Sequence, residues 1–125
     1  METVEALYAQ VRQQFPLISA SADRFHQVRY GDSLAIGFEY AWFEALADAL
    51  NAEMRRDVPY GTHEALLQFI AGAFSHGSKP VQKCIDVSFV ENLFWHTPSP
   101  KCKPYWEQLP PKLRDLYREF HQREP

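Results

Sequence analysis

The chain has 125 residues, of which 46% are hydrophobic and 14% aromatic, and its formal net charge is −3 at pH 7. This length and composition predict one domain with a buried core and exclude a disordered tail. The acidic balance argues against nucleic-acid binding, which draws its affinity from clustered lysine and arginine. Residues 1–57 contain nine acidic and five basic residues, whereas residues 99–125 contain four and six. Such a distribution is compatible with a charged protein partner and is also ordinary for a soluble protein.

Targeting and redox signals are weak throughout the chain. The first residues, METVEALYAQVRQQF, lack a basic start followed by an apolar stretch, so we expect no signal peptide. No segment approaches the ~20 apolar residues that span a bilayer. Cys84 falls in an apolar helical run and Cys102 in a segment rich in proline and lysine, which does not indicate a disulfide framework. These features predict a soluble, reduced, cytoplasmic protein with no membrane partner.

Helical periodicity dominates the first half of the chain. Apolar residues recur with 3.6-residue spacing over residues 3–15, which predicts an amphipathic helix ended by Pro16. Residues 17–32 are ambiguous between a short helix and a turn at Tyr30–Asp32. The clearest helix covers residues 33–57, where an apolar stripe consists of Phe43, Leu46, Leu50 and Met54. Arg55 and Arg56 suit the negative end of that helix.

The second half continues the helical pattern. Thr62 is a candidate N-cap for a helix over residues 63–75, and Gly77 is its expected stop. Ser78 and Pro80 open a further helix running to about Trp95. Three prolines in TPSPKCKP predict a loop over residues 97–104. A final helix follows Pro111, with inward-facing residues Leu113, Leu116, Tyr117 and Phe120. The predicted fold is therefore all-α: one domain over residues 1–125, a compact bundle of about five helices that could stack as antiparallel pairs.

The most apolar ten residues, DVSFVENLFW at 86–95, contain Glu91 and Asn92 side by side. On a helical wheel Glu91 falls between apolar positions, which predicts at least partial burial. An unpaired buried carboxylate is costly, so we expect Glu91 to pair with an arginine or to accept backbone N–H groups. Asn92 is interpreted as a second buried polar anchor. A contact for another protein is a second reading that the residues leave open. A catalytic Glu91 is the weaker alternative, because no second carboxylate or histidine stands three or four residues away.

A candidate partner-binding face lies on the predicted helix over residues 33–57. Four polar or aromatic residues share one side of this helix: Tyr40, Glu44, Asp48 and Asn51. Glu39 adds negative charge nearby. The face is either an ordinary solvated surface or a docking surface for a basic partner. Tyr105 and Trp106, beside two lysines, are either a second patch or a clamp for the preceding loop.

Motifs for other chemistry are missing from the sequence. The histidines and cysteines do not have metal-ligand spacing, and His96 with Cys102 would need two further ligands. The five glycines do not form a phosphate-binding loop, and there is no Gly-x-Ser-x-Gly nucleophile turn. We therefore predict no metal, no cofactor and no catalytic residue.

Three segments carry a resemblance to a known family: YAWFEALADALN, VQKCIDVSFVENLFW and YWEQLPPKLRDLY. Together they resemble a family of small, all-helical bacterial domains of unknown function, and the Ser–Phe–x–Glu–Asn–Leu pattern is the most specific part. Several such proteins look like immunity proteins of contact-delivered antibacterial toxins. The resemblance implies a non-enzymatic antidote for interbacterial competition, which binds and neutralises a cognate toxin domain with a basic cleft. The alternative is a helical scaffold or regulatory module that self-associates or binds a housekeeping partner.

Overall fold

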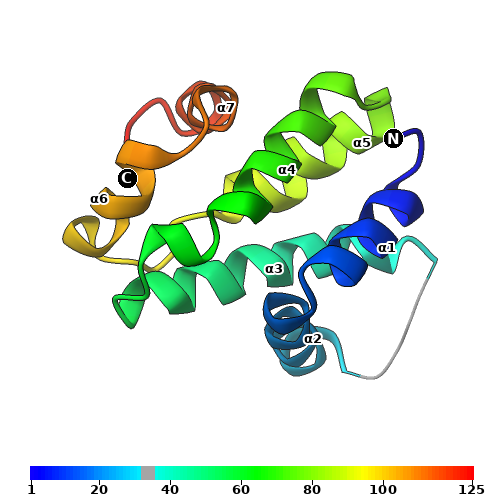
Figure 1. Cartoon of the computed structure of the whole chain (residues 1–125), viewed down its shortest axis with the longest axis horizontal. Helices are drawn as coiled ribbons and strands as arrows, with labels where there is room; N and C mark the ends of the chain where they lie inside the picture. Colours follow the sequence, from blue (N-terminus) through cyan, green and yellow to red (C-terminus); the bar gives the residue numbers. More distant parts are fainter. Residues whose placement is uncertain (32–35) are drawn as a thin grey trace.

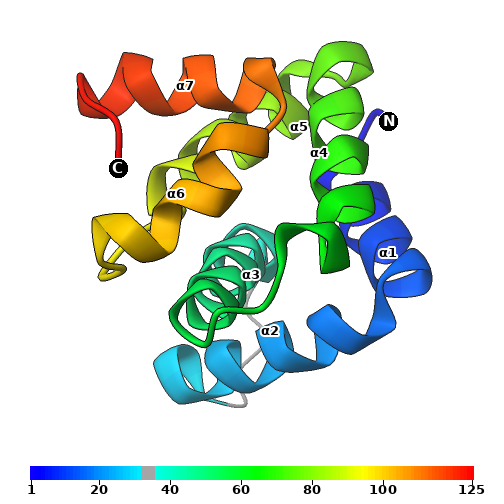
Figure 2. The same cartoon turned by 60° about the vertical axis from the view of Figure 1, so that its left-hand side comes forward.

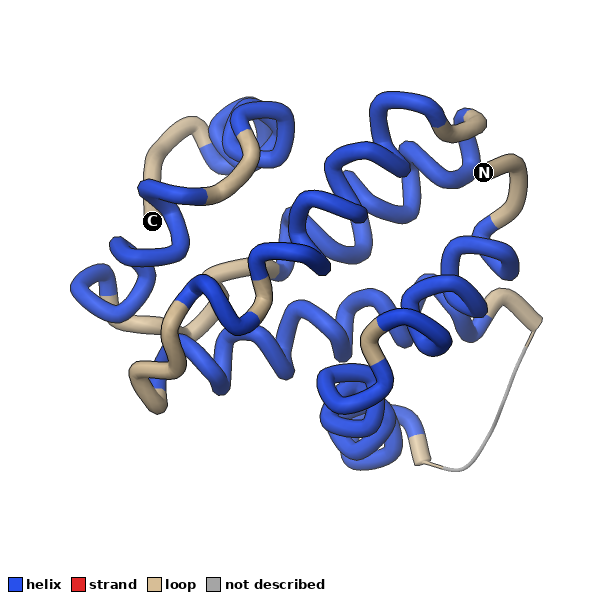
Figure 3. The backbone as a smooth tube through the Cα atoms, in the orientation of Figure 1, coloured by secondary structure: helices blue, strands red, loops and turns tan. Residues whose placement is uncertain are grey.

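The computed structural model describes residues 1–31 and 36–125, and helices account for nearly all of the described secondary structure (Figure 3). In chain order the α-helices are α1 (Val4–Gln14), α2 (Pro16–Tyr30), α3 (Phe38–Arg55), α4 (Glu64–His76), α5 (Lys79–Lys83), α6 (Ser99–Gln108) and α7 (Pro111–His121). No strand occurs in the described part of the chain, which confirms the all-α class. The predicted number of about five helices is wrong, because α2 and α6 were not expected as separate helices.

The first two helices meet at Pro16. Thr3 caps α1, because its hydroxyl oxygen accepts a hydrogen bond from the Ala6 N–H at 3.1 Å. Phe15 ends α1, as predicted, but Pro16 is also the first residue of α2. A proline suits this position because its missing N–H would have no helical partner there. The ambiguous segment 17–32 is therefore mostly helical as far as Tyr30, whereas Asp32 lies outside the described residues.

Helix α3 occupies the centre of the molecule (Figures 1 and 2). It packs against α1, α2 and α6 and against the segment that follows α5. Its predicted apolar stripe, including Phe43, Leu46 and Leu50, is completely buried. Gly37, with a φ of 80°, precedes the helix in a left-handed conformation that glycine adopts without strain. Residues 33–35 of the predicted helix lie outside the described residues.

The helix predicted over residues 80–95 changes type along its length. After α5, residues Cys84–Phe89 form a π-helix, η2, and residues Val90–Asn92 form a 3-10 turn, η3. The helix thus ends before Trp95, and the chain continues as a turn. Upstream, Thr62 belongs to the 3-10 turn η1 (Tyr60–Thr62), and His63 rather than Thr62 is the residue that precedes α4. Gly77 follows α4, as predicted.

The predicted loop over residues 97–104 is wrong, since α6 begins at Ser99. Pro100 falls in the first turn of α6, where a proline is tolerated, and Pro104 lies inside the helix. Burial of Cys102, Tyr105 and Trp106 offsets the hydrogen bond that Pro104 removes. These two aromatic rings are core residues and not an exposed patch.

Helix α7 buries Leu113, Leu116 and Tyr117 as predicted. The prediction that Phe120 also faces inward is wrong, because its side chain is 55% exposed. Phe120 stands seven residues after Leu113 and therefore lies on the same side of the helix as Leu113. At the end of α7, however, it borders a surface hollow rather than another helix.

Candidate functional site

The five residues of the predicted docking face do not share one accessible surface. Tyr40, Glu44 and Asp48 are partly exposed along α3. Glu39 is only 8% exposed and Asn51 only 1%. Their burial removes these two residues from the accessible part of the face, since they turn toward the core and not toward solvent.

Helix α2 covers much of what remains of that face. Arg29 donates from Nη1 to a carboxylate oxygen of Glu44 at 3.0 Å, and its Nη2 lies 3.1 Å from Oδ2 of Asp48. The hydroxyl of Tyr30 also donates to Glu44, at 2.6 Å. Burial raises the pKa of Asp48, and the charge of Arg29 counteracts part of that rise. A basic partner would have to compete with Arg29 for both carboxylates.

Asn51 instead anchors the turn that follows η3. Its side-chain Nδ2 donates to the backbone oxygen of Asn92 at 3.0 Å, and its Oδ1 accepts from the backbone N–H of Phe94 at 2.7 Å. Asn92 is half-buried, and its own side chain donates to the backbone oxygen of Ser88 at 2.7 Å. The sequence predicts a buried anchor at Asn92, whereas its side chain is half-buried and hydrogen-bonded to the backbone; the buried polar anchor of this turn is Asn51.

The turn held by Asn51 has a strained backbone. Phe94 has a φ of 70° and His96 a φ of 51°, in the left-handed region that side chains with a Cβ rarely adopt. Between them, Trp95 is 52% exposed, and its ring lies 4.7 Å from that of His96. The turn borders a hollow of about 460 Å³ that also includes His121 and Arg123. Such strain persists only where surrounding contacts fix it, as the Asn51 bridge does here.

Glu91 borders a separate, acidic hollow of about 220 Å³ between η2–η3 and α7. Its other walls are the carboxylates of Asp86 and Glu119 and the apolar side chains of Leu116 and Phe120. Burial raises the pKa of Glu91, and the negative charge of Asp86 raises it further. Burial likewise raises the pKa of Asp86, with a contribution from Glu119. The hollow therefore gathers negative charge against an apolar wall.

The expected partner of the Glu91 carboxylate is not present among the described residues. Neither an arginine nor a backbone N–H contacts it there, so the prediction of an internal ion pair or backbone anchor is corrected. Glu91 is half-buried, and its backbone oxygen, not its carboxylate, contacts Nε2 of His121 at 3.1 Å. This hollow could not be predicted from the sequence, because Asp86 and Glu119 are far apart in the chain and lie together only where α7 packs.

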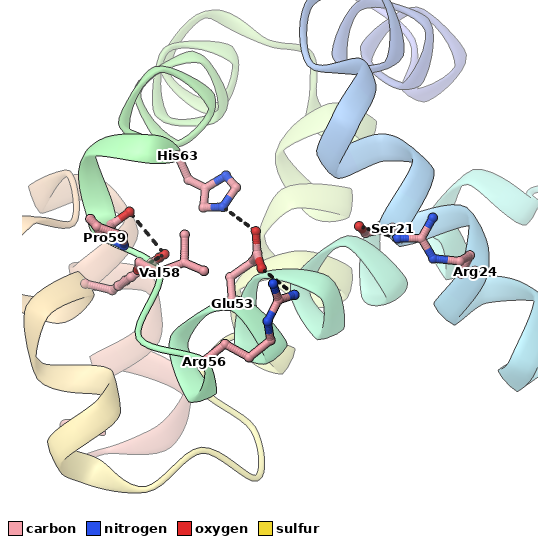
Figure 4. Close-up of polar contacts among 8 residues, drawn as sticks. Ser21, Arg24, Glu53, Arg56, Val58, Pro59 and His63 are labelled. Carbon is pink, nitrogen blue, oxygen red and sulfur yellow. Dashed lines mark hydrogen bonds and ion pairs between the residues drawn. The ribbon is translucent and has the colours of Figure 1, made fainter.

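A second polar cluster joins the end of α3 to the start of α4 (Figure 4). Nε2 of His63 lies 3.0 Å from one carboxylate oxygen of Glu53, and Arg56 donates to the other at 3.2 Å. His63 is buried, and the hydroxyl of Tyr105 fixes the adjacent loop by donating to the backbone oxygen of Val58 at 2.8 Å. The cluster fastens the α3–α4 connection onto α6.

Neither a metal site nor a membrane span is found in residues 1–31 and 36–125. No group of three histidine, cysteine or acidic side chains is placed to hold a metal ion there. No helix in the same residues is long and apolar enough to cross a bilayer. Burial raises the pKa of the Cys84 thiol to about 12 and that of Cys102 to about 11, which disfavours the thiolate form at neutral pH.

The fold and these hollows define a small all-helical domain with a charged surface. A family model covers residues 8–123, and the chain belongs to that family, described as Domain of unknown function (DUF7674). No curated protein and no solved structure matches the chain.

Proposed function

We propose that this domain is an immunity protein, which acts in the cytoplasm by binding and neutralising a cognate antibacterial toxin domain. The observation that carries the proposal is the acidic hollow of Asp86, Glu91 and Glu119 beside the exposed ring of Phe120. The three carboxylates of this hollow form no ion pair with any described residue, whereas the carboxylate of Glu44 pairs with Arg29. A hollow of this kind suits a basic segment of a protein partner.

Charge and shape support such contact for separate reasons. Unpaired carboxylates attract a positively charged surface and raise the rate of association. An exposed aromatic ring supplies the apolar contact around which binding energy usually concentrates. Two of the carboxylates already have raised pKa values, because burial and mutual repulsion disfavour their charged forms. A partner's lysine or arginine would relieve that repulsion, which favours a partner with a basic cleft.

Tyr40, Glu44 and Asp48 remain a proposed second contact. The carboxylates of Glu44 and Asp48 already pair with Arg29, so we assign this surface the smaller share of the binding free energy. The two surfaces can be compared directly, because each can be altered without touching the apolar core.

The test begins with affinity capture from the native host and identification of any stoichiometric partner. The partner's toxic domain is then expressed in a susceptible bacterium with and without this chain. We expect co-expression to restore growth and the double variant Glu91→Lys/Glu119→Lys to abolish rescue. Glu44→Lys/Asp48→Lys should weaken rescue less, and Glu2→Lys, at an exposed site near the start of the chain, is the matched control. A captured partner with no toxicity, or rescue by the Glu91/Glu119 variant, would contradict the proposal.

Self-association is a second candidate, favoured by two exposed apolar side chains on α2. Leu17 and Val28 are 87% and 89% exposed, and their spacing of eleven residues puts them on the same side of the helix. Sedimentation over a hundredfold range of concentration tests this candidate. A mass that rises with concentration, and returns to that of a monomer in Leu17→Glu/Val28→Glu, would support a scaffold role.

A further inference from the structure

A third hollow, of about 450 Å³, lies between α6 and α7, away from the acidic one. Its walls include Cys102 and Trp106 and the cations Lys103, Arg114 and Arg118. Two carboxylates, those of Glu107 and Glu124, also border it. The side chains that line the hollow, three cations and two carboxylates, carry one excess positive charge. A volume of this size falls within the range of small-molecule sites.

Two of the three cations have partners. Nζ of Lys103 lies 3.7 Å from the carboxylate of Glu107. Arg118 donates to one oxygen of Glu124 from Nε at 3.3 Å and from Nη2 at 3.0 Å. The guanidinium of Arg118 also lies over the ring of Trp106, 5.2 Å from its centroid. These contacts hold both cations in place.

Arg114 is different. Its Nε is buried and donates to no acceptor among the described residues. Its guanidinium also forms no ion pair with any of those residues. A buried donor without an acceptor costs about 1–3 kcal/mol, and more when it carries charge. The half-buried side chain borders the hollow, so turning its Nε–Nη edge toward an incoming acceptor breaks no existing hydrogen bond.

We propose that this hollow binds a small organic oxyanion, a carboxylate or phosphate carried on an apolar ring. Once Arg114 has turned its Nε–Nη edge into the hollow, the oxyanion would take both donors, the side-on geometry in which planar guanidinium groups hold such anions. The apolar part would lie against the edge of Trp106. Within the same hollow, Nε and Nη2 of Arg118 already share one carboxylate oxygen of Glu124, so one oxyanion of the chain itself is held there by an arginine edge.

Titration of the full-length, ¹⁵N-labelled protein tests the proposal, with phenyl phosphate, benzoate and inorganic phosphate as probes. We expect the arginine Nε–H signal of Arg114 and the indole signal of Trp106 to shift together and to saturate. Phenyl phosphate and benzoate separate the phosphate from the carboxylate as the preferred anion. Inorganic phosphate, which lacks the ring, should bind at least about tenfold more weakly than phenyl phosphate, a difference of about 1.4 kcal/mol.

Variants assign the binding to Arg114. Arg114→Gln should weaken phenyl phosphate binding by at least about tenfold, because it removes a charge-assisted pair of hydrogen bonds. Arg114→Lys keeps the charge without the planar fork and should also lose affinity, which guards against a folding defect in the first variant. Arg123→Gln, on the neighbouring hollow, is the matched control. Shifts that do not saturate, or equal affinities in the Arg114 and Arg123 variants, would overturn the proposal.

Discussion

The bridge formed by Asn51 should be the most sensitive polar contact in the molecule. Asn51→Ala would leave the backbone N–H of Phe94 without its partner. It would also remove one of two hydrogen bonds to the backbone oxygen of Asn92, which would keep the one from the Trp95 N–H at 3.3 Å. A buried group left unpaired costs about 1–3 kcal/mol and a lost hydrogen bond about 0.5–1.5 kcal/mol, so we expect a loss of about 2–4 kcal/mol in the free energy of unfolding. Urea unfolding followed by circular dichroism measures it, with an unchanged m-value as the sign that only stability has changed.

Two further variants separate hydrogen bonding from lost volume. Asn51→Asp keeps the acceptor for Phe94 but points an oxygen at the backbone oxygen of Asn92. Burial raises the pKa of the new carboxyl, so its protonated, donating form is favoured in the folded state. Stability of this variant should therefore be greatest below the unfolded pKa of about 3.9 and should fall as pH rises through the folded pKa.

Asn92→Ala is the matched control, since it removes a single half-buried side-chain hydrogen bond to Ser88. We expect it to cost about 1 kcal/mol. A cost of Asn51→Ala no larger than this, or an Asn51→Asp variant whose stability is independent of pH, would refute the reasoning.

Four other outcomes follow from local geometry. Gly77→Ala should lower the free energy of unfolding by about 1–3 kcal/mol, because the new Cβ would lie 2.4 Å from a backbone oxygen of α4. Gly72→Ala, whose Cβ would meet open space, should raise it by about 0.5–1 kcal/mol. Urea unfolding measures both. Gln122→Gly should raise the melting temperature, since Gln122 ends α7 with a φ of 59°; a lower value would contradict this. Cys84 should resist a thiol reagent at pH 8 until urea unfolds the chain. Because the pKa of the Glu91 carboxyl is raised in the folded state, the unmodified protein should lose stability as pH rises through that pKa. Glu91→Gln should not show this loss in thermal melts from pH 4 to 7.

Helices with a clear apolar stripe could be predicted from sequence. The stripe of Leu46 and Leu50 identifies α3, and Gly77 marks the end of α4, because burial and helix termination leave local patterns. Helix α2 has only a weak apolar stripe, so residues 17–32 remained ambiguous. Helix α6 was missed because proline content outweighed the spacing of Cys102, Tyr105 and Trp106. The π-helix that begins at Cys84 is defined by which backbone oxygen accepts each N–H, and the periodicity of the side chains does not indicate that pattern.

The surface was harder to predict than the core. Arg29 neutralises Glu44 only because α2 packs against α3, a contact that requires the missed helix. The hollow at Glu91 depends on the distance between η2–η3 and α7, which no local pattern encodes. Sequence could find the residues with unusual surroundings, such as Glu91, but not the residues that surround them.

The central position of α3 has a consequence for the order in which the molecule opens. Fraying of α1 or detachment of α7 leaves α3 covered by α2 and by the segment that follows α5. Its backbone amides should therefore exchange with deuterium only through global unfolding, whereas those of α7 exchange through smaller openings. The slowest amides in the protein would then report its full free energy of unfolding. The amides of α7 would report the smaller free energy of the local opening that separates α7 from η2–η3 and so dismantles the acidic hollow.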